Sequence, residues 1–175
     1  YSKIKNVDQI IENISNLKNP KGRFDLINFK TNKIIVDYAH TPESISQVIK
    51  YVNPYFSKVV VLFGAGGNRD KEKRKLMGTA SQLADSVIVT NDNPRNEDPI
   101  QISNDILKGC DLSKTTVILD RKEAITSAIN ELKENSVLLV LGKGHEMYQE
   151  INNSHIPFND NDFINETIGG LIWLQ

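Results

Sequence analysis

The chain has 175 residues, of which 39% are hydrophobic, and its 21 Lys and Arg against 22 Asp and Glu give a net charge of -1. This mixture is typical of one domain with an apolar core, and the near-zero charge excludes a global basic surface for nucleic acid or an anionic membrane. The single cysteine, Cys110, excludes an intrachain disulfide framework and a cysteine metal cluster, and favours a reducing compartment, by default the cytoplasm.

No apolar run approaches the roughly 20 residues of a membrane-spanning helix, and the N-terminus is polar rather than signal-like. Because the chain opens at Tyr1 rather than Met, we expect a processed or deliberately cut piece of a longer protein. A short amphipathic stretch fills much of residues 1–19, and the turn-forming residues 19–22 follow it. We therefore place a boundary there and predict one domain over residues 20–175.

Apolar β-branched segments alternate with segments of helical periodicity, which is the pattern of an α/β domain. Strands are predicted at residues 23–29, 33–38, 59–63, 86–90, 116–119 and 137–141, the first two joined as a hairpin. Helices are predicted from about residue 41 to 53, 71 to 84, 99 to 108, 120 to 132 and 162 to the end, with a turn around Asn152-Asn153. The predicted fold is a Rossmann-like three-layer α/β domain with a mostly parallel sheet plus an antiparallel N-terminal hairpin.

Ligands of open α/β sheets bind outside the carboxyl ends of the strands. In this sequence four of those ends carry unusual polar residues, at residues 37–40, 64–70, 91–95 and 142–146. We expect them to converge at one edge of the sheet, and this convergence is the main sign of a site.

The Gly64-Ala65-Gly66-Gly67 loop lies between a predicted strand and helix, where backbone N–H groups could hold an anion. It is not a dinucleotide fingerprint, since that motif needs glycine where Arg69 stands. A tight turn explains the glycines equally well, but the Arg69 guanidinium favours a carboxylate or phosphate ligand. For Lys71, Lys73 and Lys75 a solvated helix face is the simpler interpretation.

Residues 92–95, Asp-Asn-Pro-Arg, are typical of a β-turn before a capped helix, although an arginine behind a proline turn can also bind a carboxylate. Residues 142–146, Gly-Lys-Gly-His-Glu, allow close backbone approach and offer a carboxylate to an ammonium group. They form neither a Walker A loop nor a zinc motif, and His145 is equally well explained as a structural residue. Two arginines and a glutamate at one edge suggest an amino-acid ligand.

Five ordered motifs resemble the C-terminal domain of the Mur ligases, and within that family the branch that adds diaminopimelate. They occupy residues 22–25, 36–42, 63–71, 90–95 and 142–149. Residues 1–19 resemble the closing helix or linker of the family's central domain. One local departure is Asn68, where the family commonly has aspartate; it changes the loop's charge and leaves Arg69 in register.

The resemblance implies an ATP-dependent ligase that adds meso-diaminopimelate, or a close diacid analogue such as meso-lanthionine, to UDP-MurNAc-L-Ala-D-Glu in peptidoglycan precursor synthesis. Since a carboxylate is a poor electrophile, ATP first phosphorylates it, and the amine then attacks the acyl phosphate while water is excluded. In the family, ATP and Mg²⁺ are held mainly by a central P-loop domain that this sequence does not show. The resemblance thus implies a fragment that does not catalyse alone, with no certain catalytic residue and no metal ligand assigned within it, and that works with the N-terminal and central domains of the same ligase.

The resemblance assigns two groups of binding residues. The first group binds the diaminopimelate and consists of Arg69, Asp92, Asn93, Pro94, Arg95, Gly142 and Glu146. The second group lies near the nucleotide and consists of Arg23, Asp37, Tyr38 and His40. Arg95 is expected to clamp the distal carboxylate, which lysine lacks, and to be left as an unpaired charge without it. Glu146 is expected to meet the distal ammonium.

Several assignments have alternatives. Arg23 is expected at the phosphates and Asp37 at the ribose, but Tyr38 is also explained as a core residue and Asp37 as a cap at a strand end. For the whole chain, the alternatives are the C-terminal domain of a folylpolyglutamate synthetase-type ligase and a stand-alone module that binds an amino acid or nucleotide.

Overall fold

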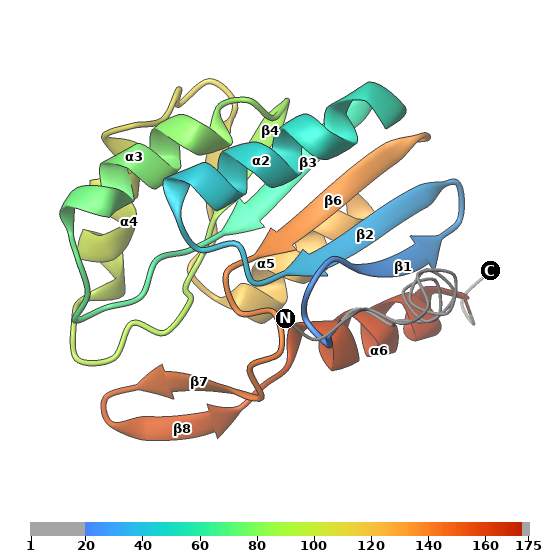
Figure 1. Cartoon of the computed structure of the whole chain (residues 1–175). Helices are drawn as coiled ribbons and strands as arrows, with labels where there is room; N and C mark the ends of the chain where they lie inside the picture. Colours follow the sequence, from blue (N-terminus) through green and yellow to red (C-terminus); the bar gives the residue numbers. More distant parts are fainter. Residues whose placement is uncertain (1–19, 173–175) are drawn as a thin grey trace, which may run out of the picture.

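A computed structural model describes residues 20–172, which form a central sheet between two helical layers (Figure 1). The strands are β1 (Asp25–Phe29), β2 (Asn32–Asp37), β3 (Lys58–Phe63), β4 (Ser86–Val89), β5 (Thr115–Val117), β6 (Ser136–Leu141), β7 (Tyr148–Ile151) and β8 (Ser154–Pro157). The helices are α2 (Pro42–Val52), α3 (Glu72–Ser81), α4 (Pro99–Leu107), α5 (Arg121–Asn130) and α6 (Asp160–Ile172), with a 3₁₀ turn, η1, at Asn53–Tyr55. The linker or closing helix expected over residues 1–19 lies outside the described residues.

The main sheet has six strands in the order β1-β2-β6-β3-β4-β5. β1 and β2 form the antiparallel hairpin, and every other pair in the sheet is parallel. The central strands β3 and β6 are apolar along nearly their whole length because helices cover both faces of the sheet. The predicted α/β fold, with its mostly parallel sheet and N-terminal hairpin, is confirmed.

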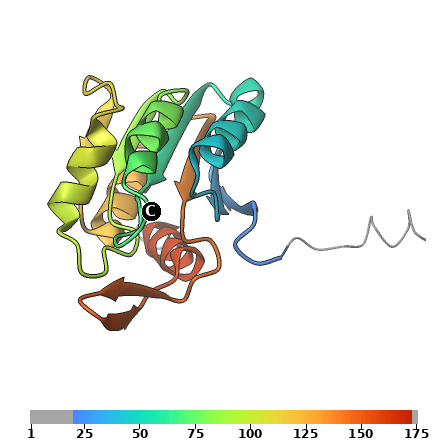
Figure 2. The same cartoon turned by 60° about the vertical axis from the view of Figure 1, so that its left-hand side comes forward.

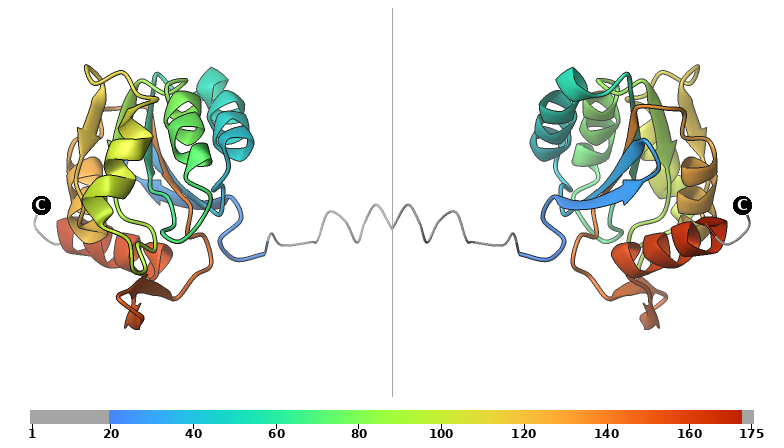
Figure 3. Two further views of the ribbon diagram at one scale, coloured as in Figure 1. Left: turned by 90° about the vertical axis from the view of Figure 1, so that its left-hand side faces the viewer. Right: turned by 90° about the vertical axis from the view of Figure 1, so that its right-hand side faces the viewer.

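Two hydrophobic clusters fix the layers (Figure 3). On one face, α2, α3 and α4 bury Ile45, Ile49, Met77, Ile102 and Ile106 against the sheet. On the other face, α5 and α6 pack through Ala124, Ile125, Ile129, Ile164 and Ile168. The parallel strands are therefore held between helices, and their carboxyl ends open at one edge.

Local capping chemistry begins the helices where the sequence predicts. The hydroxyl of Thr41 accepts a hydrogen bond from the Ser44 N–H, and Pro42 occupies the first turn of α2. Asp98 caps α4 and Asp120 caps α5 through their carboxylates. No helix in residues 20–172 is long and apolar enough to cross a bilayer.

The C-terminal third differs most from the expectation. β7 and β8 form a separate antiparallel hairpin that projects from the main sheet, where only a turn at Asn152-Asn153 was predicted (Figures 1 and 2). Both asparagines have positive φ, 48° and 59°, as a tight hairpin turn requires. Helix α6 begins at Asp160, two residues before the predicted start, and α3 ends at Ser81 rather than near residue 84.

Candidate functional site

The carboxyl ends of β2, β3, β4 and β6 surround a cavity of about 390 Å³. The predicted site residues that line this cavity are Tyr38, His40, Arg69, Asp92, Asn93, Arg95, Gly142 and Glu146. The sequence therefore located the convergence of loops correctly. Arg23, Asp37 and Pro94 do not line the cavity, and what each residue binds stays a prediction.

The segment at residues 92–95 is held against the glycine-rich loop by backbone contacts. The Gly67 N–H donates to the Asn93 carbonyl over 2.8 Å. A Cβ atom on Gly67 would lie 1.9 Å from the Pro94 carbonyl oxygen, so only glycine fits there. Pro94 is buried at this contact and acts as packing between the loops.

Arg95 is paired with protein groups, which corrects the expectation that it would be an unpaired charge without a ligand carboxylate. Its Nε lies 2.8 Å from Oε2 of Glu150 on β7, and its Nη1 donates to the Gly67 carbonyl over 2.9 Å. The guanidinium has five N–H donors, so most remain for a ligand carboxylate. The guanidinium is therefore not a bare charge, and a carboxylate placed beside it would gain hydrogen bonds rather than relieve an unpaired charge.

The β7–β8 hairpin supports the same segment through its backbone. The Arg95 N–H donates to the Glu150 carbonyl, and the Asn152 N–H donates to the Arg95 carbonyl, both over 2.9 Å. Gln149 donates its side-chain amide to the Asp92 carbonyl. These bonds fix Arg95 at a φ of 53°, a left-handed conformation that is uncommon for arginine.

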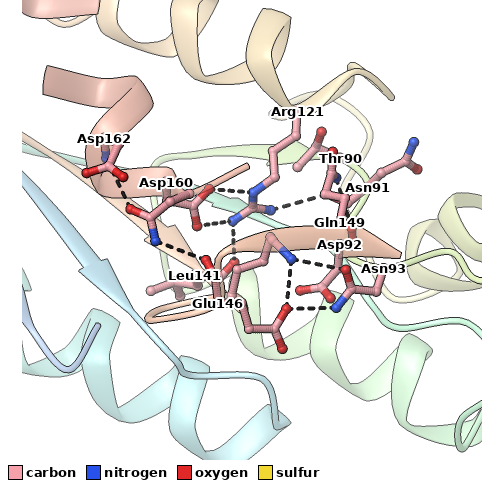
Figure 4. A network of polar contacts seen from close by, with 12 residues as sticks. Thr90, Asn91, Asp92, Asn93, Arg121, Leu141, Glu146, Gln149, Asp160 and Asp162 are labelled. Carbon is pink, nitrogen blue, oxygen red and sulfur yellow. Dashed lines mark hydrogen bonds and ion pairs between the residues drawn. The ribbon is translucent and has the colours of Figure 1, made fainter. Parts of the chain in front are cut away.

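Glu146 shares one of its carboxylate oxygens with two protein donors (Figure 4). Oε2 accepts from Asn93 Nδ2 over 2.8 Å and from Lys143 Nζ over 2.7 Å. Partial burial raises the pKa of Glu146, but the hydrogen bonds from Lys143 and Asn93 outweigh it, and the pKa lies below its usual value. Glu146 is thus held as a carboxylate at the wall of the cavity.

Asp92 is a buried carboxylate that receives no hydrogen bond from any residue between 20 and 172. Burial raises its pKa, and the charges of Arg121 and Lys143 offset only part of that effect. The carboxylate lies close to the Gly142 backbone, where a Cβ atom would approach Oδ2 to 2.6 Å. An acidic group exposed only to the cavity is suited to a cationic ligand.

A buried ion pair joins the strand ends behind the cavity (Figure 4). Arg121, at the start of α5, binds both carboxylate oxygens of Asp160 at the start of α6, over 2.8 and 2.9 Å. The same guanidinium donates to the carbonyl of Asn91, two residues after β4, and to that of Leu141, the last residue of β6. This contact holds the segments that carry Asp92 and Gly142 at a fixed separation.

The cations near the glycine-rich loop have two different environments. Arg69 and Lys73 line the cavity mouth with exposed side chains, so Lys73 is not only part of a solvated helix face as predicted. Arg74, which lies among the lysines interpreted as a solvated face and was given no role from the sequence, is 1% exposed. It pairs with Glu97 and Asp105 and donates to the Gly66 carbonyl, and Glu97 also accepts from the Asn68 N–H.

The residues predicted near the nucleotide lie around the end of β2. The Arg23 guanidinium lies 4.5 Å over the Tyr38 ring, and that ring contacts His40 and His145 edge-on or tilted. Asp37 accepts the N–H groups of Phe24 and Ala39, so it caps the strand end. Residues 20–172 contain no group of three or more His, Cys, Asp or Glu placed to hold a metal ion.

Three structural residues of the site were missed from the sequence: Lys143, Arg121 and Glu150. Their charges are ordinary in a sequence, and their partners are mostly distant, 39 residues away for Arg121 and Asp160. Lys143 did lie within a motif that was singled out, between two glycines. The apolar run of residues 137–141, which only Gly142 separates from Lys143, was the available signal that the lysine is buried.

Comparisons with known proteins identify relatives of the whole domain. The family model described as Mur ligase, glutamate ligase domain, matches residues 22–144. The UDP-N-acetylmuramoyl-L-alanyl-D-glutamate--2,6-diaminopimelate ligases of Rickettsia montanensis and Rickettsia prowazekii are 45% and 47% identical over 165 and 161 residues, or 92% and 90% of this chain. The chain spans only about a third of the length of these relatives, 34% and 33%.

A solved structure of a ligase with the same name has the same fold. It superposes with a TM-score of 0.84 at 36% identity, covering 95% of this chain and 35% of the other. The similarity therefore extends over the β7–β8 hairpin and α6 as well as the family match.

Proposed function

The chain belongs to the Mur ligase family, as its glutamate ligase domain, and on this basis we propose that it is the amino-acid-binding C-terminal domain of an ATP-dependent ligase that adds meso-diaminopimelate to UDP-MurNAc-L-Ala-D-Glu. This reaction belongs to peptidoglycan precursor synthesis. Residues 20–172 supply the acceptor side, and ATP, Mg²⁺ and the UDP-linked substrate are bound chiefly by the N-terminal and central domains of the same ligase. The reaction takes place in the cytoplasm.

One observation carries the proposal: a single cavity is lined by both cations and anions, among them Arg69, Arg95, Asp92 and Glu146, together with the exposed pair Asp70 and Lys73 at its mouth. A diamino diacid carries two carboxylates and two ammonium groups, so its charges complement this set. Arg95 binds the distal carboxylate through its free N–H donors, and Glu146 binds the distal ammonium. Arg69 binds the carboxylate nearer the reacting amine, and the Asp92 carboxylate faces the ligand's positive charge.

The domain's contribution to the reaction is orientation. An amine attacks an acyl phosphate efficiently when the two groups are held in line and water is excluded. Two charged contacts at the distal end of the ligand leave the other amine at the open side of the cavity. Closure of this domain over the central domain then brings that amine to the activated carboxylate.

The nucleotide lies on the side of β2. The Arg23 guanidinium and the His40 imidazole are exposed there, and both suit a phosphate or a nucleotide edge. Tyr38 offers a ring face, and Asp37 has lone pairs remaining for a ribose hydroxyl. When bound, ATP supplies the phosphoryl group that activates the carboxylate; the residues of this chain position it.

An amide NMR titration of the ¹⁵N-labelled chain with meso-diaminopimelate and, separately, L-lysine tests the proposal. We expect shifts at residues 64–70, 92–95 and 142–146 that are larger at equal concentration for the diacid. Equal responses to both amino acids would contradict the proposed substrate. In further titrations, a response to ATP confined to residues 22–40 with none to either amino acid would instead support a nucleotide-binding module, and a response to L-glutamate alone would support a folylpolyglutamate synthetase-type domain.

A further inference from the structure

Lys143 is fully buried, with a side chain that is 0% exposed, and lies two residues after the end of β6. A buried ammonium is costly unless its three N–H donors all have acceptors. Nζ of Lys143 has three: Glu146 Oε2 at 2.7 Å, Asn93 Oδ1 at 3.0 Å and the Tyr148 carbonyl at 2.7 Å. The ammonium is therefore fully satisfied inside the protein, and Lys143 does not line the cavity.

These acceptors come from segments that the site must bring together. Asn93 follows β4, Glu146 belongs to the loop after β6, and Tyr148 begins β7. Both polar atoms of the Asn93 side-chain amide are bonded, since Oδ1 also accepts the Glu150 N–H and Nδ2 donates to Glu146. One lysine thus fixes the side chains of Asn93 and Glu146 relative to each other and to the hairpin.

The arrangement leaves one Glu146 oxygen available. Oε2 is occupied by Lys143 and Asn93, whereas Oε1 receives no hydrogen bond from residues 20–172. We propose that Lys143 is a positioning residue that keeps Glu146 ionised and fixes its carboxylate so that Oε1 serves the ligand's ammonium. The proposal deepens the proposed function and rests on it for the identity of that ammonium, since Lys143 acts through Glu146 and touches no ligand.

Other charged groups also act on Glu146. Arg95 contributes a favourable charge, and Asp92 an unfavourable one, from the facing loop. Arg121 and Asp160 lie behind them as a neutral pair. Lys143 is distinguished from these by direct contact with the carboxylate.

The first test compares Lys143→Met with Lys114→Met in a chain carrying ¹³C-labelled glutamate. Lys114 is a matched control, because its Nζ also donates to two carbonyls, those of Gln82 and Ala84, remote from the cavity. The carboxyl shift of Glu146 is followed against pH without ligand. We expect its midpoint to rise by about 1 pH unit or more in Lys143→Met, as loss of a contacting opposite charge predicts, and to stay unchanged in Lys114→Met.

The same variants are then titrated with meso-diaminopimelate. Affinity should fall about tenfold in Lys143→Met, equivalent to about 1.4 kcal/mol, and stay unchanged in Lys114→Met. An unchanged Glu146 midpoint in a folded Lys143→Met chain would overturn the inference. If the unsubstituted chain bound no diamino acid, the proposed function would fail, while the midpoint would still decide whether Lys143 controls Glu146.

A second measurement covers the case in which Lys143→Met does not fold. The ¹⁵N resonance of Lys143 Nζ is recorded at neutral pH in the unsubstituted chain and in Glu146→Gln. A buried, fully bonded ammonium should give a signal protected from exchange that moves in the variant. Absence of a protected signal, or a signal indifferent to Glu146→Gln, would overturn the inference.

Discussion

The Nε atom of Arg95 lies 2.8 Å from Oε2 of Glu150, so the arginine proposed to bind the ligand's carboxylate is oriented by a strand of the β7–β8 hairpin. Glu150 holds one edge of the guanidinium and leaves the other for the ligand. Two features of the hairpin therefore affect recognition: its backbone bonds fix the Arg95 main chain, and its carboxylate fixes the side chain.

Substitution of Glu150 removes its carboxylate and leaves the backbone hydrogen bonds of the hairpin to Arg95 in place. Glu150→Ala should weaken meso-diaminopimelate binding about fivefold, since a lost hydrogen bond to a charged group costs about 1 kcal/mol or more. Glu150→Gln keeps an acceptor oxygen and should lose less. Calorimetric titration measures both, with Glu131→Ala as the control, because the Glu131 carboxylate accepts a hydrogen bond from Ser127 on α5, away from the cavity. Tighter binding by Glu150→Ala would mean that Glu150 competes with the ligand for Arg95.

The ionised Asp92 carboxylate should lower the free energy of unfolding, although it is the form that faces the ligand's positive charge. Because burial raises its folded-state pKa above the ordinary value of 3.8, the folded chain binds this proton more tightly than the unfolded chain does. Ionisation therefore destabilises the fold at neutral pH, and Asp92→Asn should gain about 1–3 kcal/mol there. This gain in the free energy of unfolding should decrease as the pH falls toward 3.8, the ordinary pKa of an aspartate carboxyl. Urea unfolding at several pH values measures it; a variant less stable at neutral pH would contradict this account.

The buried pair of Arg121 and Asp160 should be essential to the fold. Asp160→Asn leaves a buried guanidinium without its charge partner and should cost about 3–5 kcal/mol in urea unfolding. Lys108→Met removes the partner of Asp105 at the surface, where the lysine side chain is 62% exposed, and should cost about 1 kcal/mol or less. Equal costs would mean that the buried pair does not hold the strand ends together.

Gly142 should tolerate no side chain. Its φ of 109° disfavours any other residue, and a Cβ atom would lie 2.6 Å from Oδ2 of Asp92. Gly142→Ala should therefore lose more than about 1 kcal/mol of stability, together with diaminopimelate binding. Gly170→Ala is the control, because no neighbouring group within residues 20–172 lies within 4 Å of its added Cβ in α6, and it should gain about 0.5–1 kcal/mol. Thermal unfolding of both variants measures the contrast.

The sequence predicted the features that local chemistry determines. The apolar runs of β3 and β6 and the caps Thr41, Asp98 and Asp120 act within a few residues, so they are visible in the chain itself. The convergence of the loops followed from the parallel sheet.

The features that were missed depend on distant partners. β8 is exposed along its length, so no alternation of apolar and polar residues marks it as a strand. Arg74 and Arg121 look like surface charges until Glu97, Asp105 and Asp160 are brought to them by the fold. The pairing of Arg95 with Glu150 requires the hairpin, which the sequence did not predict.

Calorimetric titration of Arg95→Ala with meso-diaminopimelate and L-lysine tests most directly whether Arg95 recognises a second carboxylate. We expect the affinity for the diacid to fall about 10- to 100-fold, since a charge-assisted hydrogen bond contributes about 1.5–3 kcal/mol, and the affinity for lysine to change little. The preference for the diacid would then disappear. An Arg95→Ala chain that still preferred meso-diaminopimelate to lysine by the original factor would contradict the claim.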